Sequence, residues 1–280
     1  MSGGSSSSLS QPTPSPALLA SKPLFVSLYG GAGRCAEEAS KIGCNGLIFD
    51  LAHHDSNNIC RPKVQKDIES LVVERDVEAL GIDLLCSSWT LARRAPVWSK
   101  MPSPLRDSEK YLFGLPDLNE ADNKRVRVGN QMYRHAIKLI NLCIEHGVCG
   151  YLENPLSSRL WRTPGIQKLL KSNKGWWTTC HMCQYGVQWR KATRFFFWGV
   201  PKDSIVLKTC TMHFGRCSAT NKRHLDLSGK HGSRFWTAVA QVYPRELAKD
   251  LIIQLLEVIR KKKRTSLPDP PEVHKMGLGC

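Results

Sequence analysis

The central part of the chain alternates between short apolar runs and amphipathic stretches of helical period. The apolar runs predict buried strands over residues 24–28, 46–49, 82–85, 148–152 and 195–198. Apolar positions at helical spacing predict helices over residues 35–42, 62–78, 122–146 and 244–260. Strands that alternate with helices form mostly parallel sheets covered on both faces. We therefore expect an α/β fold with a mostly parallel central sheet.

The two ends of the chain differ in composition from this central part. Residues 1–22 are rich in Ser and Pro, and residues 261–280 combine a basic run with several prolines. Such segments bury too little apolar surface to offset the entropy of ordering them, so we expect two disordered tails around one domain over residues 23–260. Inside that domain, residues 178–232 are basic and rich in Cys and His, and we interpret them as a target-contacting insertion.

The charge balance points to a polyanionic partner. The 280 residues carry a formal net charge of +16, which favours nucleic acid over a membrane surface. No apolar run approaches the roughly 20 residues of a membrane span, and the N-terminus has no secretory h-region. We expect an intracellular monomer without a membrane partner. The basic run at residues 261–264 is either a nuclear signal or a solvated helix end.

Eleven cysteines are an odd number in a chain long enough to bury a core without disulfides. They are therefore better interpreted as core residues, metal ligands or a nucleophile. The densest group of soft ligands lies between residues 180 and 224. Its members with spacing suited to a tetrahedral zinc site are Cys183, Cys210, Cys217 and His224. Unrelated core thiols and surface histidines are the alternative.

Polar or reactive residues follow several of the predicted strands. These are Gly30, Gly31 and Gly33 after the first strand, Asp50 after the second, Cys86 after the third and Glu153 after the fourth. Ligands bind outside the carboxyl ends of the strands in parallel sheets. The sequence therefore predicts that these residues share one ligand-binding edge.

The glycines and Asp50 suit a small-molecule site. Glycine at a strand–helix turn lets the backbone turn sharply and approach a ligand, although such turns also join many strands to helices. Asp50 could accept hydrogen bonds from ribose hydroxyls. Asp55 is a competing candidate, and a capping role for Asp50 is the alternative.

Cys86 and Glu153 suit chemistry on a bound substrate. A thiol where a buried strand opens into a loop, followed by the basic pair Arg93-Arg94, is placed to act as a nucleophile, although most such cysteines are core residues. Glu153 is either a buried acid with a raised pKa or an ordinary loop anion.

Residues 154–202 contain nine basic residues and no acidic ones. Beyond Trp161, four tryptophans are interleaved with them, namely Trp176, Trp177, Trp189 and Trp198. Basic residues interleaved with aromatic ones suit phosphate contacts and base stacking. The alternative is a solvated basic face over a few core aromatics.

Taken together, these stretches resemble the cytosine-5 DNA methyltransferase family, in a compact form like those of phages and mobile elements. The resemblance covers about residues 24–256. Its motifs are FVSLYGGAG at 25–33, LCSSW at 85–89, YLENP at 151–155, YGVQWRKATR at 185–194 and the closing helix at 243–256. PLR at 104–106, SSRLW at 157–161 and RKAT at 190–193 are especially similar to the mobile-element forms.

The resemblance implies a Rossmann-like class I methyltransferase fold and a specific chemistry. It implies that S-adenosylmethionine is held by Tyr29, Gly30, Gly31, Gly33 and Asp50. The thiolate of Cys86 would add to cytosine C6 while Glu153 steadies a proton at N3. Arg190 or Arg194 would lie near the base and its phosphate. The partner would be double-stranded DNA with its target base flipped out.

Two departures from the family pattern leave other functions open. Leu85 replaces the proline before the catalytic cysteine, and Ser27 replaces the usual acidic residue of the first motif. A catalytically degenerate, methyltransferase-like nucleic-acid-binding domain of a mobile element is therefore the alternative. An amino-methyltransferase would need a Pro-Pro-aromatic loop in the stretch that begins at Asp83, which this chain lacks.

Overall fold

The structure is a computed structural model that describes residues 22–74, 77–91, 93, 103–107, 109–212 and 214–265. The predicted N-terminal tail, apart from Lys22, and the predicted C-terminal tail from residue 266 onward lie outside the described residues. Arg94 of the basic pair also lies outside them.

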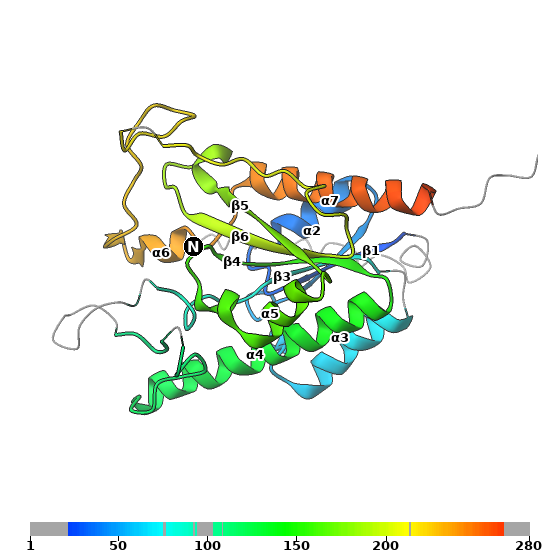
Figure 1. Ribbon diagram of the computed structural model, residues 1–280, viewed down its shortest axis with the longest axis horizontal. Coiled ribbons are helices and arrows are strands. Elements are labelled where there is room, and N and C mark those ends of the chain that lie inside the picture. The colour runs from blue at the N-terminus through cyan, green and yellow to red at the C-terminus, as the bar shows by residue number, and fades with distance from the viewer. Residues whose placement is uncertain are drawn as a thin grey trace, which may run out of the picture.

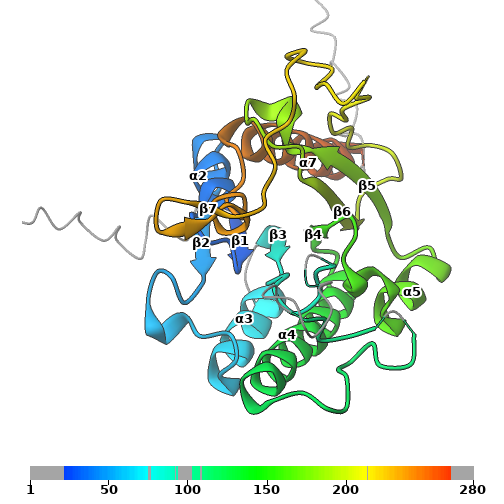
Figure 2. The same cartoon turned by 90° about the vertical axis from the view of Figure 1, so that its left-hand side faces the viewer.

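A six-stranded sheet forms the centre of the molecule, with strand order β2-β1-β3-β4-β6-β5 (Figures 1 and 2). The bounds are β1 Leu24–Leu28, β2 Asn45–Phe49, β3 Val77–Asp83, β4 Cys149–Pro155, β5 Trp176–His181 and β6 Ala192–Trp198. The first four strands are parallel, whereas β6 is antiparallel to both β4 and β5. The chain leaves β1 for β2 on one side and returns to β3 on the other. This reversal is the topological switch point of a doubly wound sheet.

Helices cover both faces of the sheet, as predicted (Figure 1). On one face lie α3 Pro62–Glu74, α4 Glu120–Glu145 and α5 Pro164–Lys171, and on the other α2 Arg34–Lys41 and α7 Arg245–Thr265. Side chains along β1 alternate between the two cores, because successive residues of a strand point to opposite faces. Val26 packs on the α3–α4 side, and Phe25 packs on the α2–α7 side. The predicted mixed α/β, Rossmann-like fold is confirmed.

The predicted boundary between the helix at 62–78 and the strand at 82–85 is wrong. The helix α3 ends at Glu74, and β3 runs from Val77 to Asp83. Glu78 looked like a polar helix position, yet it lies buried in the strand and pairs with Arg260 of α7 at 3.0 Å. A tertiary partner makes this carboxylate tolerable inside a central strand.

The predicted insertion at 178–232 is placed too early. Residues 176–181 and 192–198 form β5 and β6, and β6 pairs with β4 inside the main sheet. The basic and aromatic composition of this stretch obscured β5, and the observed β6 is longer than the strand predicted at 195–198. The irregular part begins only after Trp198. We call residues 199–229 the connecting segment; it is drawn in yellow and stands out from the sheet in Figure 1.

The last helix extends past the predicted end of the domain at Arg260. Helix α7 continues to Thr265 and carries Lys262, Lys263 and Arg264 in its last turn. Lysine and arginine are good helix formers, and their charges are favourable near a helix C-terminus. Between the connecting segment and α7 lie β7 Lys230–His231, β8 Arg234–Phe235 and α6 Trp236–Val239. No described helix is long and apolar enough to cross a membrane.

Candidate functional site

A pocket of about 290 Å³ lies at the carboxyl ends of the parallel strands, beside the switch point between β1 and β3. Its volume is near the lower end of the range of about 300–1,000 Å³ that is usual for small-molecule sites. Among its lining residues are Tyr29, Gly30, Gly31, Arg34, Asp50, Asp83, Leu85, Cys86, Glu153, Lys191 and Tyr243. The predicted convergence of the strand-end residues on one edge is therefore observed.

The glycine turn follows β1. A Cβ atom at Gly30 would lie 2.2 Å from Ser27 Oγ, so any other residue there would force the buried Ser27 side chain to move. Gly31 has φ +52°, a conformation that favours glycine, and nothing lies within 4 Å of its Cβ position. The turn therefore presents bare backbone to the pocket. Gly33 is the N-cap of α2 and is not among the lining residues.

Tyr29 sits at the end of β1 in an unusual conformation. Its φ of 58° is uncommon for a residue with a bulky side chain, and such strain costs about 1–3 kcal/mol. Its backbone N–H donates to Phe49 O at 2.9 Å. Its hydroxyl is buried without a hydrogen-bond partner among the described residues, and burial raises its pKa. Strained residues with unused polar groups are typical of ligand sites.

Asp50 connects the loops after β1 and β2. Its two carboxylate oxygens accept the backbone N–H of Gly31 at 2.9 Å and of Ala52 at 2.7 Å. The capping role is therefore present. Each oxygen still has accepting capacity, because a carboxylate offers about four lone-pair sites. The competing candidate Asp55 begins a 3-10 helix, η1 (Asp55–Asn57), and is not among the lining residues.

Asp83 and Glu153 form a pair of acids at the floor of the pocket. They are register partners at the ends of β3 and β4, so both side chains point to the same face. Burial raises the pKa of both groups; the charge of Glu153 adds to the effect at Asp83, and Lys191 opposes it at Glu153. Tyr243 donates to Asp83 Oδ1 at 2.5 Å, whereas Glu153 Oε1 has no partner among the described residues.

Sequence reasoning missed Asp83 as a site residue. The available signal was its place at the end of an apolar run, three residues before Cys86. Its partner Tyr243 belongs to the predicted closing helix region but lies just before α7, which begins at Arg245. Only the register of β3 against β4 reveals that Asp83 and Glu153 are neighbours.

Cys86 lies in a tight turn after β3. Its carbonyl accepts the backbone N–H groups of Trp89 and Thr90, both at 2.9 Å. The buried amide of Asn154 donates to Leu84 O at 2.7 Å and holds the start of the turn to β4. The thiol is half-buried and faces the pocket.

The electrostatic surroundings of the Cys86 thiol are mixed. Burial raises its pKa, the charge of Glu153 raises it further, and Lys191 lowers it. The positive charge that would favour a thiolate at Cys86 therefore comes from one residue, Lys191. Thiolate formation at this site requires a further cation or the neutralisation of Glu153.

Arg106 packs against the turn that carries Cys86 and holds it through hydrogen bonds. It is fully buried, and its guanidinium carbon lies 3.5 Å from the ring centroid of Trp89. All of its N–H donors are used: the acceptors are Ser88 O at 3.0 Å, Ser88 Oγ at 3.1 Å, Leu112 O at 3.0 Å, Asn130 Oδ1 at 2.7 Å and Val126 O at 3.3 Å. The PLR motif therefore supports the segment that carries Cys86.

The predicted arginines do not line the pocket, whereas Lys191 does. Arg190 Nη2 lies 3.1 Å from His181 Nε2, towards the connecting segment. The guanidinium of Arg194 lies over the ring of Trp177, 4.2 Å from its centroid. Arg194 pairs with Asn154 across β6 and β4, so it faces the sheet side opposite Glu153. Because successive residues of a strand point to opposite faces, residues that are close in sequence come to lie on different sides of the sheet.

The four tryptophans of the basic stretch have different roles. Trp176 and Trp198 are buried in the core, so they cannot stack on bases. Trp177 is 36% exposed, and Trp189 packs near Trp236 with ring centroids 6.3 Å apart. The interpretation as a stacking surface therefore applies at most to Trp177 and Trp189.

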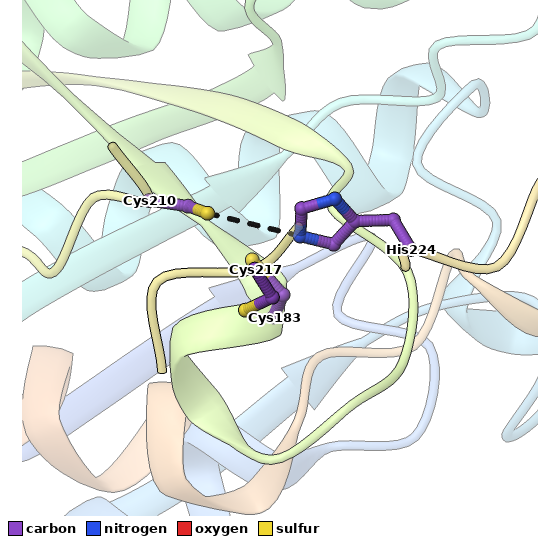
Figure 3. A group of neighbouring side chains, drawn as sticks. All are labelled: Cys183, Cys210, Cys217 and His224. Carbon is purple, nitrogen blue, oxygen red and sulfur yellow. Dashed lines mark hydrogen bonds between the residues drawn. The ribbon is translucent and has the colours of Figure 1, made fainter. Parts of the chain in front are cut away.

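The predicted metal ligands come together at a second place. The ligand atoms of Cys183, Cys210, Cys217 and His224 all lie within 4.8 Å of one another (Figure 3). Cys183 comes from a 3-10 helix, η3 (Met182–Tyr185), and the other three from the connecting segment. This arrangement can hold a metal ion.

Comparison with known proteins gives a distant similarity to a solved structure. No family model matches the sequence, and no curated protein matches it. Among solved structures, the chain is similar to a methyltransferase of Entamoeba histolytica, with 13% sequence identity and a TM-score of 0.37. The match covers 67% of this chain and 57% of that one, so this chain spans less than two thirds of that structure.

The buried acid pair predicts a pH-dependent stability. The raised pKa of Glu153 means that the folded state keeps its proton at pH values where the unfolded chain, with a pKa of about 4.3, has lost it. The free energy of unfolding therefore falls as pH rises above about 4.3. We expect Glu153→Gln to remove this fall, so that the variant melts at a higher temperature than wild type at neutral pH and at a similar temperature near about pH 4.

Thermal melts of both proteins across this pH range measure the effect. The exposed Glu257→Gln on α7 is the control and should leave the pH profile unchanged. A Glu153→Gln variant that is less stable than wild type at neutral pH would show that the carboxylate is favourably paired.

Proposed function

We propose that this protein is an S-adenosylmethionine-dependent DNA methyltransferase that modifies cytosine at C5 through a covalent adduct with Cys86. The observation that carries the proposal is the pocket at the switch point, where Cys86 and the buried Glu153 share one edge with a bare glycine turn. A nucleophile, a proton-bearing acid and a nucleotide-type cradle in one pocket suit group transfer to a base.

The cofactor would occupy the part of the pocket formed by the loops after β1 and β2. Tyr29, Gly31 and Asp50 line this part. The Tyr29 hydroxyl is without a partner among the described residues, and Asp50 has unused acceptor capacity for ribose hydroxyls. S-adenosylmethionine would supply an electrophilic methyl group on its sulfonium.

Cys86 and Glu153 would divide the chemistry on the base. Cytosine C5 is a weak nucleophile, and addition of the Cys86 thiolate to C6 makes it enamine-like. Glu153 would donate a proton to N3 as the new S–C6 bond pushes the electron pair of the C5–C6 double bond toward C4 and N3. The raised pKa of Glu153 suits this role, because a protonated carboxyl can donate near neutral pH. After methylation, a solvent water would take the C5 proton as Cys86 leaves as a thiolate, and N3 would return its proton to Glu153, which restores the aromatic ring.

Lys191 would take the place expected of an arginine. It is a lining residue, and its charge lowers the pKa of both Cys86 and Glu153. It would therefore favour the thiolate while Glu153 holds its proton and carries no charge. Arg190 and Arg194 would act farther out, on the phosphate backbone.

Double-stranded DNA is the proposed partner. The net charge of +16 favours a polyanion, and the partly exposed Trp177, with the Arg194 guanidinium over its ring, adds a cation and an aromatic surface for nucleic acid. A cytosine inside the duplex cannot reach Cys86, so it would have to flip out, at a cost of a few kcal/mol that pocket contacts offset.

Labelled-methyl transfer tests the proposal. Purified protein incubated with methyl-labelled S-adenosylmethionine and duplex DNA is expected to label the DNA, and nucleoside analysis is expected to locate the label on C5 of cytosine. The same assay with RNA tests the choice of nucleic acid. Label on an exocyclic amino group, or in RNA alone, would contradict the assignment.

A second function is favoured by the Cys86 environment. The thiol has a raised pKa, and Leu85, which replaces the family's proline before it, is 50% exposed. A degenerate methyltransferase-like domain that binds nucleic acid without turnover fits these observations. DNA binding that is retained without any transfer of label would identify this function.

A further inference from the structure

We propose that Cys183, Cys210, Cys217 and His224 bind one zinc ion that fixes the connecting segment to the β5–β6 turn. This site is separate from the pocket, and its role does not depend on methyl transfer. Figure 3 shows the three thiols and the imidazole pointing toward a common centre.

The distances fit a tetrahedral zinc site. Zn–S bonds of about 2.3 Å and Zn–N bonds of about 2.0–2.1 Å at tetrahedral angles place sulfur atoms about 3.8 Å apart and sulfur about 3.5 Å from nitrogen. Cys210 Sγ lies 3.7 Å from His224 Nε2, and all four ligand atoms lie within 4.8 Å of one another. A small contraction of the cluster is enough to reach ideal geometry.

The donor set selects the metal and its role. Three thiolates and one imidazole favour zinc, and four protein ligands leave no open position for a substrate or water. The three cysteines are free and buried, and they form a small core of their own apart from the two main cores. The site is therefore structural and closed.

The sulfur atoms of the three cysteines accept hydrogen bonds from N–H groups around the cluster. Ser218 N–H donates to Cys210 Sγ at 3.5 Å, and the amide of Gln184 donates to Cys217 Sγ at 3.5 Å and to Cys183 Sγ at 3.7 Å. Donors around metal-bound thiolates orient them and stabilise their negative charge. Unrelated core thiols, the alternative interpretation, have no need of such donors.

The first part of the connecting segment is anchored by Ile205 and Leu207, which are buried in the α2–α7 core, but its described residues from 211 to 224 have little else to hold them. An isolated bridge between Arg216 and Arg223 is the only β-pairing recorded among its described residues. Phe214 is 88% exposed and Val206 is 72% exposed, so their apolar surface contributes little to stability. Long irregular segments are uncommon in compact domains unless something fixes them. Metal binding can supply the free energy that is needed to order such a segment.

Hydrogen bonds join the metal site to residues 181–190, which lead to the pocket residue Lys191 at the start of β6. Cys210 N–H donates to His181 Nδ1 at 2.8 Å, and Leu225 N–H donates to Gln188 O at 2.9 Å. Met182 N–H donates to Arg190 O at 2.9 Å, next to Lys191. Ordering of the segment by zinc therefore positions the start of β6 at the pocket.

Metal analysis of the full-length protein tests the site. Protein purified without chelator is expected to contain near-stoichiometric zinc, and reconstitution with cobalt is expected to give the charge-transfer absorption of thiolate-bound Co²⁺. Cys217→Ser should lose the metal, His224→Cys should retain it with four thiolates, and Cys60→Ser, outside the cluster, should behave like wild type. Absence of zinc and of the cobalt signal in wild type, or equal metal content in Cys217→Ser, would overturn the proposal.

Hydrogen exchange tests the structural role independently of catalysis. Removal of zinc by a chelator is expected to increase amide exchange in the connecting segment and in residues 182–191, while β1, β3 and β4 stay protected. Bound zinc whose removal leaves exchange in these regions unchanged would refute the tethering role.

Discussion

Cys86→Ala is expected to abolish methyl transfer, with a loss of about four orders of magnitude or more, while binding of S-adenosylmethionine stays close to wild type. The thiol is the proposed nucleophile, and the other cysteine that lines the pocket, Cys35, is buried and has its pKa raised by that burial. The cofactor loops after β1 and β2 do not depend on the Cys86 side chain. The Cys86 turn is held by backbone hydrogen bonds and by Asn154, both of which the variant keeps.

The experiment pairs labelled-methyl transfer with calorimetric titration of the cofactor. Cys60→Ala is the matched control, because Cys60 is also a half-buried free cysteine but is not among the pocket-lining residues. DNA in which fluorine replaces the C5 proton of cytosine gives a second readout. Fluorine cannot leave as a proton does, so wild type should form a persistent covalent adduct and Cys86→Ala should form none. A variant that still methylates DNA sinks the nucleophile assignment.

Arg106→Ala is expected to destabilise the protein by about 3–5 kcal/mol and to lower the melting temperature by on the order of 10 °C. The substitution leaves buried acceptors without this donor, among them Leu112 O and Ser88 O, and each such group costs about 1–3 kcal/mol. It also removes the cation that lies 3.5 Å from the Trp89 ring centroid. Arg106→Lys should recover only part of the loss, because lysine has fewer donors and no planar fork.

Chemical denaturation of each variant measures the effect. Arg134→Ala, an exposed arginine on α4, is the matched control and should change the free energy of unfolding by less than about 0.5 kcal/mol. If Arg106→Ala proves as benign as Arg134→Ala, the buried network does not anchor the Cys86 turn.

The buried acid pair illustrates a conflict between stability and function. The two carboxyl groups lie on adjacent strand ends, where burial raises the pKa of both and the charge of Glu153 raises that of Asp83 further. Glu153 Oε1 accepts no hydrogen bond from the described residues, so no such contact offsets the cost of burying it. Such groups are usual where a protein has to hold a proton for chemistry. Glu153→Gln is accordingly expected to gain stability and lose activity.

The sequence was sufficient for features that depend on local pattern. Apolar runs and helical spacing located most elements within a few residues, as for α4, where Asn119 caps the helix by accepting from Asp122 N–H. The order of strands and helices predicted the doubly wound sheet, because connections between parallel strands have few alternatives. Residue chemistry and spacing were enough to name the Cys183, Cys210, Cys217 and His224 cluster.

Other features depended on contacts between distant segments. Glu78 was assigned to a helix because its partner Arg260 is remote in the sequence. Trp198 was considered for base stacking although it is buried, because composition does not distinguish a core tryptophan from an exposed one.

By itself, the sequence determined the α/β architecture and the ligand-binding edge, because secondary structure follows local periodicity and parallel strands end together. Only the tertiary structure decided which side chains meet in the pocket. Strand register pairs Asp83 with Glu153, and strand period turns Arg194 to the face opposite Glu153 while Lys191 lines the pocket. The packing of the chain likewise buried Arg106 under Trp89. These contacts join residues far apart along the chain, so no local pattern could reveal them.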